Sequence, residues 1–213
     1  MASLLDTVSS FPEPRPFQVD AHDALRRGFT AGHKNQLLVS ATGSGKTYIG
    51  LRVAKEALAK SKRVVFLCDR TTLINQTSET ADRYGLTDHG IIQAKHPRRN
   101  IEAPLQIASV QTIAKRDYWP QADVIIIDEA HTQHKTWTDY INHTRAAVVG
   151  LSATPFSAGL GKLFTNVVNA TSMNDLTQSG VLVPLRVFSC TRTNAMPYAH
   201  SAAEGHCLCS GGT

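Results

Sequence analysis

Residues 40–47 read SATGSGKT and directly follow a short apolar run. The glycines at positions 43 and 45 allow the backbone to turn sharply, so that successive N–H groups point at a polyphosphate. The helix predicted over residues 46–60 adds the partial positive charge of its N-terminus. Lys46 is then expected to reach the terminal phosphates as a point charge. The stretch therefore predicts a phosphate-binding loop between a strand and a helix.

Two further details concern this loop. The Thr47 hydroxyl is an expected Mg²⁺ ligand. Loops of this pattern usually have glycine six positions before the lysine, and here that position is Ser40, a small residue that we expect to serve. The alternative, a glycine-rich turn without a ligand, fits less well between a strand and a helix. The loop residues predicted to bind a nucleotide are Thr42, Gly43, Ser44, Gly45, Lys46 and Thr47.

The composition is that of an ordinary globular protein. The chain has 213 residues, 42% of them hydrophobic and 18% charged, which suits one domain with a small appendage. The net charge of +5 favours a polyanionic partner no more than it favours simple surface solubility. No apolar stretch approaches the length of a membrane span, and the N-terminus lacks the regions of a secretory signal. We therefore expect a cytoplasmic, intracellular protein with no membrane partner.

The four cysteines indicate a reduced protein without structural metal. Cys68 ends an apolar run and is predicted to be a buried thiol. The stretch His206–Cys209 reads HCLC, which contains residue types that bind zinc. It has neither a CxxC pair nor a second cluster, so a zinc site is not favoured.

Apolar runs recur along the chain, separated by amphipathic segments. Besides the run before the glycine loop, strands are predicted over residues 63–68, 104–109, 123–128, 146–151 and 181–188. A second helix is predicted over residues 71–84. Near-continuous apolar strands that alternate with helices predict an α/β fold, with a mostly parallel sheet and helices on both faces. Right-handed crossovers then place the carboxyl ends of the strands, and the loops after them, on one edge.

An acid pair, Asp128 and Glu129, ends the apolar run 124–127. A carboxylate at a strand end beside the phosphate loop can hold the metal through water, so Asp128 is the second predicted Mg²⁺ ligand. Glu129 is the candidate that polarises the attacking water during hydrolysis. The alternative is a pair of solvated acids at a turn, which the preceding apolar residues disfavour. The predicted catalytic residues are Lys46, Asp128 and Glu129.

Residues 128–131 read DEAH, and together with the glycine loop they resemble the superfamily 2 helicases and translocases. Five other segments resemble motifs of this family in the same order: RPFQ at 15–18, FLCDRTTLINQ at 66–76, ASVQTI at 108–113, GLSATP at 150–155 and LTQSGVLVP at 176–184. The resemblance covers residues 13–190 and is to bacterial and phage DEAD/DEAH-type proteins, such as the RadD-like group. It implies a RecA-like P-loop NTPase domain, ATP and Mg²⁺ as cofactors, and ATP-dependent helicase or translocase activity.

The resemblance assigns roles outside the glycine loop. Gln18, with Arg15 in the same segment, is expected at the nucleotide, where its amide offers a donor and an acceptor to the adenine edge. Ser152 and Thr154 are expected to hydrogen-bond the acidic motif through His131 and to couple nucleotide state to domain movement. Alternatives stay open: Gln18 as a polar residue of the first helix, and the two hydroxyls as caps of a turn.

Two segments are expected to contact the backbone of nucleic acid, with DNA favoured over RNA. Arg70 supplies charge, and neighbouring polar side chains supply neutral hydrogen bonds to phosphate. Such contacts position a nucleic-acid strand without reading its sequence. Thr71 and Ser109 also stand where helix N-caps are expected, which does not exclude phosphate contact. The predicted nucleic-acid-binding residues are Arg70, Thr71, Gln111 and Thr112. Three aromatic residues are interpreted as packing rather than base-stacking residues: Tyr118, Trp119 and Trp137.

Superfamily 2 motors have two RecA-like domains, and this sequence shows a candidate for the first only. Residues 13–190 are assigned to it, residues 1–12 to an N-terminal extension and residues 191–213 to an irregular tail. The second domain is expected in cis or in trans, and this chain by itself is expected to bind ATP weakly and hydrolyse it slowly. A catalytically weak nucleic-acid-binding module and a truncated helicase fragment are the alternatives. A small-molecule P-loop kinase explains neither DEAH nor SATP.

Overall fold

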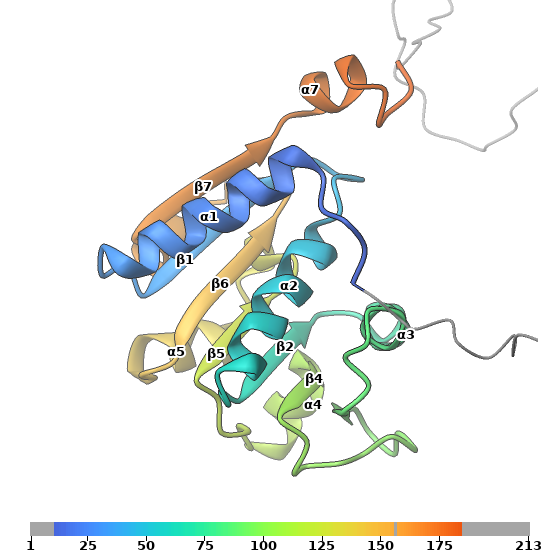
Figure 1. Cartoon of the computed structure of the whole chain (residues 1–213). Helices are drawn as coiled ribbons and strands as arrows, with labels where there is room; N and C mark the ends of the chain where they lie inside the picture. The colour runs from blue at the N-terminus through green and yellow to red at the C-terminus, as the bar shows by residue number, and fades with distance from the viewer. Residues whose placement is uncertain (1–10, 156, 185–213) are drawn as a thin grey trace, which may run out of the picture. The chain divides into compact units, whose positions relative to one another are not determined.

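The computed structural model describes residues 11–155 and 157–184, which form a sheet between two layers of helices (Figure 1). The strands are β1 (Asn35–Ser40), β2 (Val64–Cys68), β3 (His89–Ile92), β4 (Leu105–Ser109), β5 (Val124–Ile127), β6 (Ala147–Ser152) and β7 (Asn166–Thr171). The helices are α1 (Pro16–Thr30), α2 (Lys46–Ala59), α3 (Thr71–Arg83), α4 (Val110–Arg116), α5 (Lys135–His143), α6 (Leu160–Leu163) and α7 (Met173–Gln178). A 3₁₀ helix, η1, spans Ala130–Thr132.

All pairs of neighbouring strands in this sheet are parallel, in the order β3-β4-β2-β5-β6-β1-β7. The predicted α/β fold is therefore confirmed, and over the described residues the sheet is entirely rather than mostly parallel. Strand β1, which leads into the glycine loop, lies between β6 and the outermost strand, β7. The carboxyl ends of all the strands lie on this one edge, as parallel pairing requires.

Alternate residues of each strand face opposite sides of the sheet, and helices bury both sides. Phe66 and Cys68 of β2 belong to the core cluster beneath α1, α2 and α3. Val65 and Leu67 belong to the second cluster, which α4, α5 and α6 complete. Burial on both faces explains why the strands read as continuous apolar runs instead of alternating polar and apolar residues.

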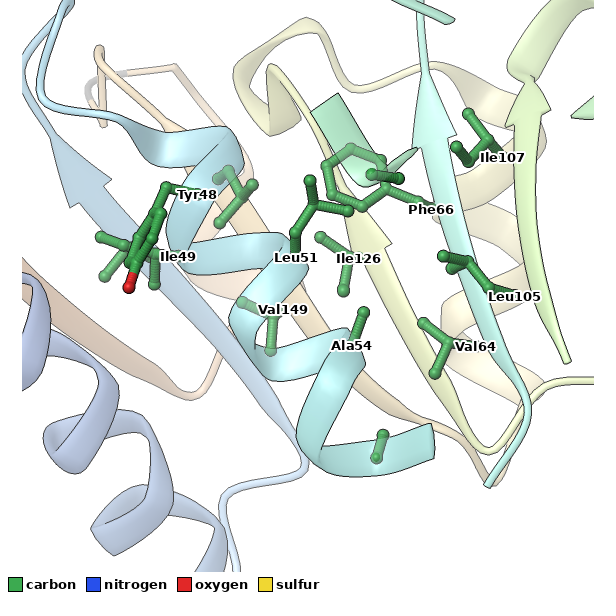
Figure 2. Close-up of a cluster of buried hydrophobic side chains, with 14 of the residues drawn as sticks. Tyr48, Ile49, Leu51, Ala54, Val64, Phe66, Leu105, Ile107, Ile126 and Val149 are labelled. Carbon is green, nitrogen blue, oxygen red and sulfur yellow. The ribbon is translucent and has the colours of Figure 1, made fainter. Parts of the chain in front are cut away.

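Helix α2 is the element that joins the glycine loop to the first core cluster. Figure 2 shows its Leu51 and Ala54 above the side chains of the central strands. Phe66 of β2 lies opposite Ile126 of β5, and Ile126 lies opposite Val149 of β6. All five residues are fully buried, so the sheet and α2 form one packed unit.

Two observed strands, β3 and β7, were not predicted from the sequence. Strand β3 is short and begins at His89, a polar residue that is nevertheless 3% exposed. Its ring nitrogens are paired with the Ser78 hydroxyl at 2.8 Å and the Leu86 carbonyl oxygen at 2.7 Å. Strand β7 is an edge strand in which only Val168 is buried. Neither strand has the continuous apolar run that identified the others.

The strand predicted over residues 181–188 is wrong over the part that the structure describes. Residues 181–184 are irregular after α7, and the N–H groups of Val181 and Leu182 both donate to the Leu176 carbonyl oxygen, at 2.9 and 3.0 Å. These bonds satisfy a carbonyl at the end of the helix, which competes with strand pairing. The remaining residues of this predicted strand lie outside the described ranges.

The predictions of one buried thiol and two helix N-caps had different outcomes. Cys68 is fully buried, as predicted. Ser109 is confirmed as the N-cap of α4, because its Oγ accepts a hydrogen bond from the Thr112 N–H at 3.3 Å. The N-cap predicted at Thr71 is wrong: Arg70 occupies that position, Thr71 is the first helical residue, and no side chain caps the helix.

The three aromatic residues pack to different degrees. Trp137 is fully buried, with its ring centroid 6.4 Å from that of Phe164. Trp119 stacks on Tyr140, with 3.8 Å between ring centroids and 4° between ring planes. Tyr118 is 47% exposed. Packing is thus confirmed for the two tryptophans, while the tyrosine stands at the surface.

Some predictions concern residues outside the described ranges. The tail 191–213, with its HCLC stretch, and residues 1–10 of the extension are among these. Phe11 lies within the described part, with ring centroids 5.1 Å from Tyr48 and 4.8 Å from Tyr84, so it packs on the domain. None of the helices in the described ranges is both long and apolar enough to cross a membrane.

We expect Trp137→Ala to lower the free energy of unfolding by about 3–5 kcal/mol, because it removes a fully buried ring and leaves a cavity between α5 and the sheet. Urea unfolding followed by far-UV circular dichroism measures this change. The matched control is Tyr118→Ala, which truncates an exposed aromatic residue and should change the free energy by no more than about 0.5 kcal/mol. Equal losses in both variants would contradict the assignment of Trp137 to the core.

Candidate nucleotide-binding site

The glycine loop has the backbone conformation that a phosphate cradle needs. Gly43 and Gly45 have φ angles of 81° and 86°, in the left-handed region that glycine adopts at little cost. Gly45 is also the N-cap residue of α2, so the helix N-terminus begins directly at the loop. A Cβ atom on Gly45 would lie 2.7 Å from Nε2 of Gln18, which leaves no space for a side chain.

Ser40 resolves the imperfect match to the usual glycine pattern. It is the last residue of β1 and fully buried, and its Oγ donates to Oγ of Ser44 at 2.7 Å. Ser40 does not have a positive φ, so the backbone there does not require glycine. The serine instead ties the start of the loop to its middle by a hydrogen bond that glycine cannot make.

Gln18 is 5% exposed and fastens α1 to the glycine loop. Its Nε2 donates to the Ser44 carbonyl oxygen at 3.0 Å, and its Oε1 accepts from the Arg15 N–H at 2.9 Å. The structure therefore brings Arg15, Gln18 and Ser44, all predicted to bind the nucleotide, together at the loop. Adenine recognition by this amide stays a prediction, because both of its functions are engaged with the protein here.

Asp128 is a buried carboxylate at the end of β5. It is 8% exposed, its backbone N–H donates to the Leu67 carbonyl oxygen at 2.9 Å, and its Oδ1 accepts from the Glu129 N–H at 3.0 Å. Burial and then the Glu129 charge raise the pKa of Asp128 to about 6, while the Glu129 N–H, Lys46 and His131 act in the opposite direction.

This environment fits a divalent cation. A carboxylate whose charge is poorly solvated is stabilised by a nearby metal ion, and carboxylate and hydroxyl oxygens are ligands that Mg²⁺ accepts. Asp128 and Thr47 are the residues that would hold it. Across the described residues no group of three His, Cys, Asp or Glu side chains could hold a metal by itself. A cation here would therefore need water and phosphate oxygens as further ligands, as Mg²⁺ in nucleotide sites does.

The turn after Asp128 connects the acid pair to β6. Glu129 has a φ of 50°, an uncommon conformation for a residue with a side chain, and η1 follows it. His131 Nδ1 lies 3.3 Å from Oε2 of Glu129 and 3.3 Å from Oγ of Ser152. The Thr154 N–H donates to the same Ser152 Oγ at 3.1 Å. The structure thus brings together the acidic motif and the residues expected to couple to it.

The segments predicted to contact nucleic acid lie beside this site. Thr42, Arg70, Glu129, His131 and Thr154 contribute to one pocket of about 590 Å³. The Arg70 side chain is exposed and makes no hydrogen bond or ion pair within the described part of the chain. It is therefore available to a ligand. The pocket also includes Asp69, Thr72, Leu73, Gln76, Thr132 and Ala153.

Two other predicted contact residues are engaged within the protein. The Gln111 Nε2 donates to Oδ1 of Asp69 at 2.7 Å, and its Oε1 accepts from the Ser109 hydroxyl at 2.8 Å. Thr112 Oγ1 accepts from the Ala94 N–H at 3.4 Å. Asp69 was missed by sequence reasoning, although it follows a buried strand just as Asp128 does. That shared position at a strand end was the signal that could have identified it.

Residues 11–157 match the family described as the type III restriction enzyme, res subunit, and this match covers more than half of the chain. The chain belongs to this family. The resemblance to superfamily 2 helicases, built on the glycine loop and DEAH, is confirmed by this membership and by the fold. The chain is accordingly a RecA-like motor domain of the helicase ATPase type.

The similar curated proteins are much longer than this chain. The type I restriction enzyme EcoAI endonuclease subunit of Escherichia coli is 29% identical over 196 residues, which cover 82% of this chain and 24% of that protein. The SauCOLORF180P endonuclease subunit of Staphylococcus aureus (strain COL) is 32% identical over 133 residues, which cover 55% of this chain and 14% of that protein. This chain spans a quarter or less of the length of these relatives.

Solved structures share the fold. The UvsW helicase from bacteriophage T4 has a TM-score of 0.63 at 19% identity, over 74% of this chain and 60% of that chain. A nuclease-deletion mutant of the type ISP restriction-modification enzyme LlaGI, in complex with a DNA substrate mimic, has a TM-score of 0.61 at 18% identity, over 80% of this chain and 21% of that chain. The Hef helicase domain of Pyrococcus furiosus gives 0.59 at 22% identity, over 78% and 39%.

We expect Asp128→Asn to stabilise the protein above pH 6, in the absence of nucleotide and Mg²⁺. Burial raises the pKa of Asp128 from its usual 3.8 to about 6, so the folded state binds this proton more tightly than the unfolded state does. The wild type therefore loses stability as the pH rises between about 4 and 6, by up to about 3 kcal/mol, and the neutral amide does not. Urea unfolding at pH 4 to 8 measures the difference.

The control for this pH series is Asp139→Asn, which neutralises an exposed carboxylate of α5. It should follow the wild type at every pH. A difference between Asp128→Asn and the wild type that does not grow between pH 4 and pH 6 would show that the carboxyl group is not held in a poorly solvated place.

Proposed function

We propose that this chain binds Mg-ATP and serves as the first motor domain of an ATP-dependent DNA helicase or translocase inside the bacterial or phage-infected cell. The observation that carries the proposal is the convergence of three loops at one edge of the sheet. The glycine loop follows β1, the acid pair follows β5, and Ser152 ends β6, its hydroxyl 3.3 Å from His131. A generic phosphate-binding loop would not require this third element.

Each residue has a distinct task in the proposed reaction. Lys46 and the loop N–H groups bind the phosphates, while Thr47 and Asp128 would hold Mg²⁺, which would supply positive charge to the phosphate oxygens. Glu129 orients the attacking water and accepts its proton. His131 lies between Glu129 and Ser152, so a movement of Glu129 can be transmitted to the end of β6. A second RecA-like domain, in cis or in trans, would complete the nucleotide site from the opposite side.

DNA is the proposed polyanion, with RNA as the competing possibility for the test. The structurally similar enzyme LlaGI was solved in complex with a DNA substrate mimic, and the EcoAI and SauCOLORF180P relatives are endonuclease subunits of restriction enzymes. The exposed Arg70 beside the pocket supplies the positive charge that phosphate contacts need. Sequence-independent binding follows, because contacts to phosphate carry no base information.

We expect Lys46→Ala to weaken binding of a fluorescent ATP analogue by about tenfold or more, because the charge that faces the phosphates is removed. Glu129→Gln should bind the analogue as the wild type does and lose turnover by about 10²–10⁴-fold, since the amide cannot accept the proton. Fluorescence titration and phosphate release over long incubations measure the two effects.

The matched control is Lys60→Ala, which removes an exposed lysine at the other end of α2. It should leave both nucleotide affinity and turnover unchanged. Nucleotide binding that is equal in all four proteins would contradict the site, and phosphate release that persists in Glu129→Gln would contradict its role. DNA binding without turnover in any form would favour a nucleic-acid-binding module.

We expect Arg70→Ala to weaken binding of single-stranded DNA and to lower the slope of log affinity against log salt by about 1, because one phosphate contact is lost. Anisotropy titrations from low to high salt, with DNA and RNA oligonucleotides of the same sequence, measure both quantities. Arg27→Ala is the control, an exposed arginine near the far end of α1. An equal slope in Arg70→Ala and wild type would remove Arg70 from the interface.

A further inference from the structure

Asp69 stands where the two nucleic-acid segments and the acidic motif meet. It follows Cys68 at the carboxyl end of β2, and its side chain is 22% exposed. One carboxylate oxygen, Oδ1, accepts from Nε2 of Gln111 at 2.7 Å and lies 2.7 Å from Nε2 of His134. A single oxygen thus contacts the segment after β4 on one side and the segment after DEAH on the other.

The link to the segment after β4 is well fixed. Gln111 lies in the first turn of α4, which Ser109 caps. Its Nε2 also donates to the backbone carbonyl of Asp69, and its Oε1 accepts from the Ser109 hydroxyl at 2.8 Å. Both ends of the amide are therefore occupied, so Gln111 moves together with Asp69.

The link to the acidic motif depends on His134. Its Nε2 is buried, lies 2.7 Å from Oδ1 of Asp69 and has no hydrogen-bond partner among the described residues. His134 is the N-cap residue of α5, so a change in its position moves the start of that helix. The Asp69 carboxylate lies 2.7 Å from this nitrogen, so a movement of the carboxylate changes the surroundings of the ring directly.

The short turn between Glu129 and His134 can transmit such a change. It consists of η1 between two residues in the left-handed conformation, Glu129 at φ 50° and Gln133 at φ 46°. Gln133 is further held because its Nε2 donates to the Ala158 carbonyl oxygen at 2.8 Å. Two residues of this turn thus hold a conformation that is costly for residues other than glycine, and the turn is all that separates His134 from Glu129 along the chain.

We propose that Asp69 is a positioning residue that couples occupancy of the nucleic-acid segments to the placement of Glu129. This inference rests on the proposed function, since it assumes that the chain binds both nucleotide and DNA. Phosphates bound beside Arg70 and α4 shift the Asp69–Gln111 pair, and the carboxylate passes that shift to His134 and the acidic motif. Coupling between two ligands is reciprocal, so it is measurable from either side.

The test measures nucleotide affinity with and without DNA. A fluorescent ATP analogue is titrated into the chain with Mg²⁺, alone and with saturating oligo(dT), and the ratio of the two dissociation constants gives the coupling. The wild type should show a ratio that departs from one by about fivefold or more. Asp69→Ala and His134→Ala should each bring the ratio to within about twofold of one. The double variant should go no further, because both changes break the same link.

Two controls separate coupling from general damage. Glu79→Ala removes an exposed carboxylate of α3, and His143→Ala removes an exposed histidine at the end of α5. Both should keep the wild-type ratio. Should Asp69→Ala fail to fold, as circular dichroism would show, His134→Ala breaks the link from the surface side and decides the question.

The outcomes distinguish the inference from the proposed function. A wild-type chain that binds neither the nucleotide analogue nor DNA contradicts the proposed function itself. A wild type that binds both without coupling, or variants that bind both and keep the wild-type ratio, overturns the inference and leaves the proposed function in place. Loss of coupling in His134→Ala with unchanged affinity for each separate ligand supports it, because a structural defect would weaken binding as well.

Discussion

The site depends on the parallel pairing of three neighbouring strands, β5, β6 and β1. Because paired strands end at the same edge, the loops after them meet without any long connection. The register places Val39 of β1 opposite Ser152 of β6, one residue before the glycine loop begins. On the next strand, Ile127 lies opposite Gly150. A slip of one residue in this register would turn the core side chains over and separate the phosphate loop from the acid pair.

This arrangement buries polar groups that a simple core would exclude. Ser40, Ser44 and Ser152 are fully buried, and each has a hydrogen-bond partner in the loops. Asp128 differs, because its hydrogen bond from the Glu129 N–H does not offset the loss of water, and its pKa rises to about 6. The fold thus keeps one carboxylate in an unfavourable place, and a bound cation would relieve that cost. Such local cost at a site, offset by the packed sheet, is the usual relation between stability and function.

Short-range patterns explain most of what the sequence predicts. The glycine loop, DEAH and the buried strands can each be recognised from a few consecutive residues. The two layers of helices are predicted because strands alternate with helices along the chain. The contacts that the sequence misses join residues far apart: Asp69 and Gln111 are 42 positions apart, as the hydrogen bond between them records. No local pattern distinguishes a glutamine that binds phosphate from one that binds a neighbouring carboxylate. Strand β3 was missed for another reason: it begins with the polar His89, whose burial depends on partners at Ser78 and Leu86 that no apolar pattern indicates.

The Asp69 carboxylate places a negative charge among the segments predicted to bind nucleic acid. Arg70 attracts phosphate, whereas its neighbour Asp69 carries negative charge into the same pocket. A phosphate that approaches Arg70 therefore repels this carboxylate, by an amount that grows as water leaves the pocket. The Asp69 carboxylate cannot come closer to His134, because its Oδ1 is already 2.7 Å from Nε2, so a displaced carboxylate moves the ring with it. Gln111 then does not bind phosphate itself. It fixes the Asp69 carboxylate, whose charge is repelled by a bound phosphate, and the short turn before His134 transmits the displacement to Glu129.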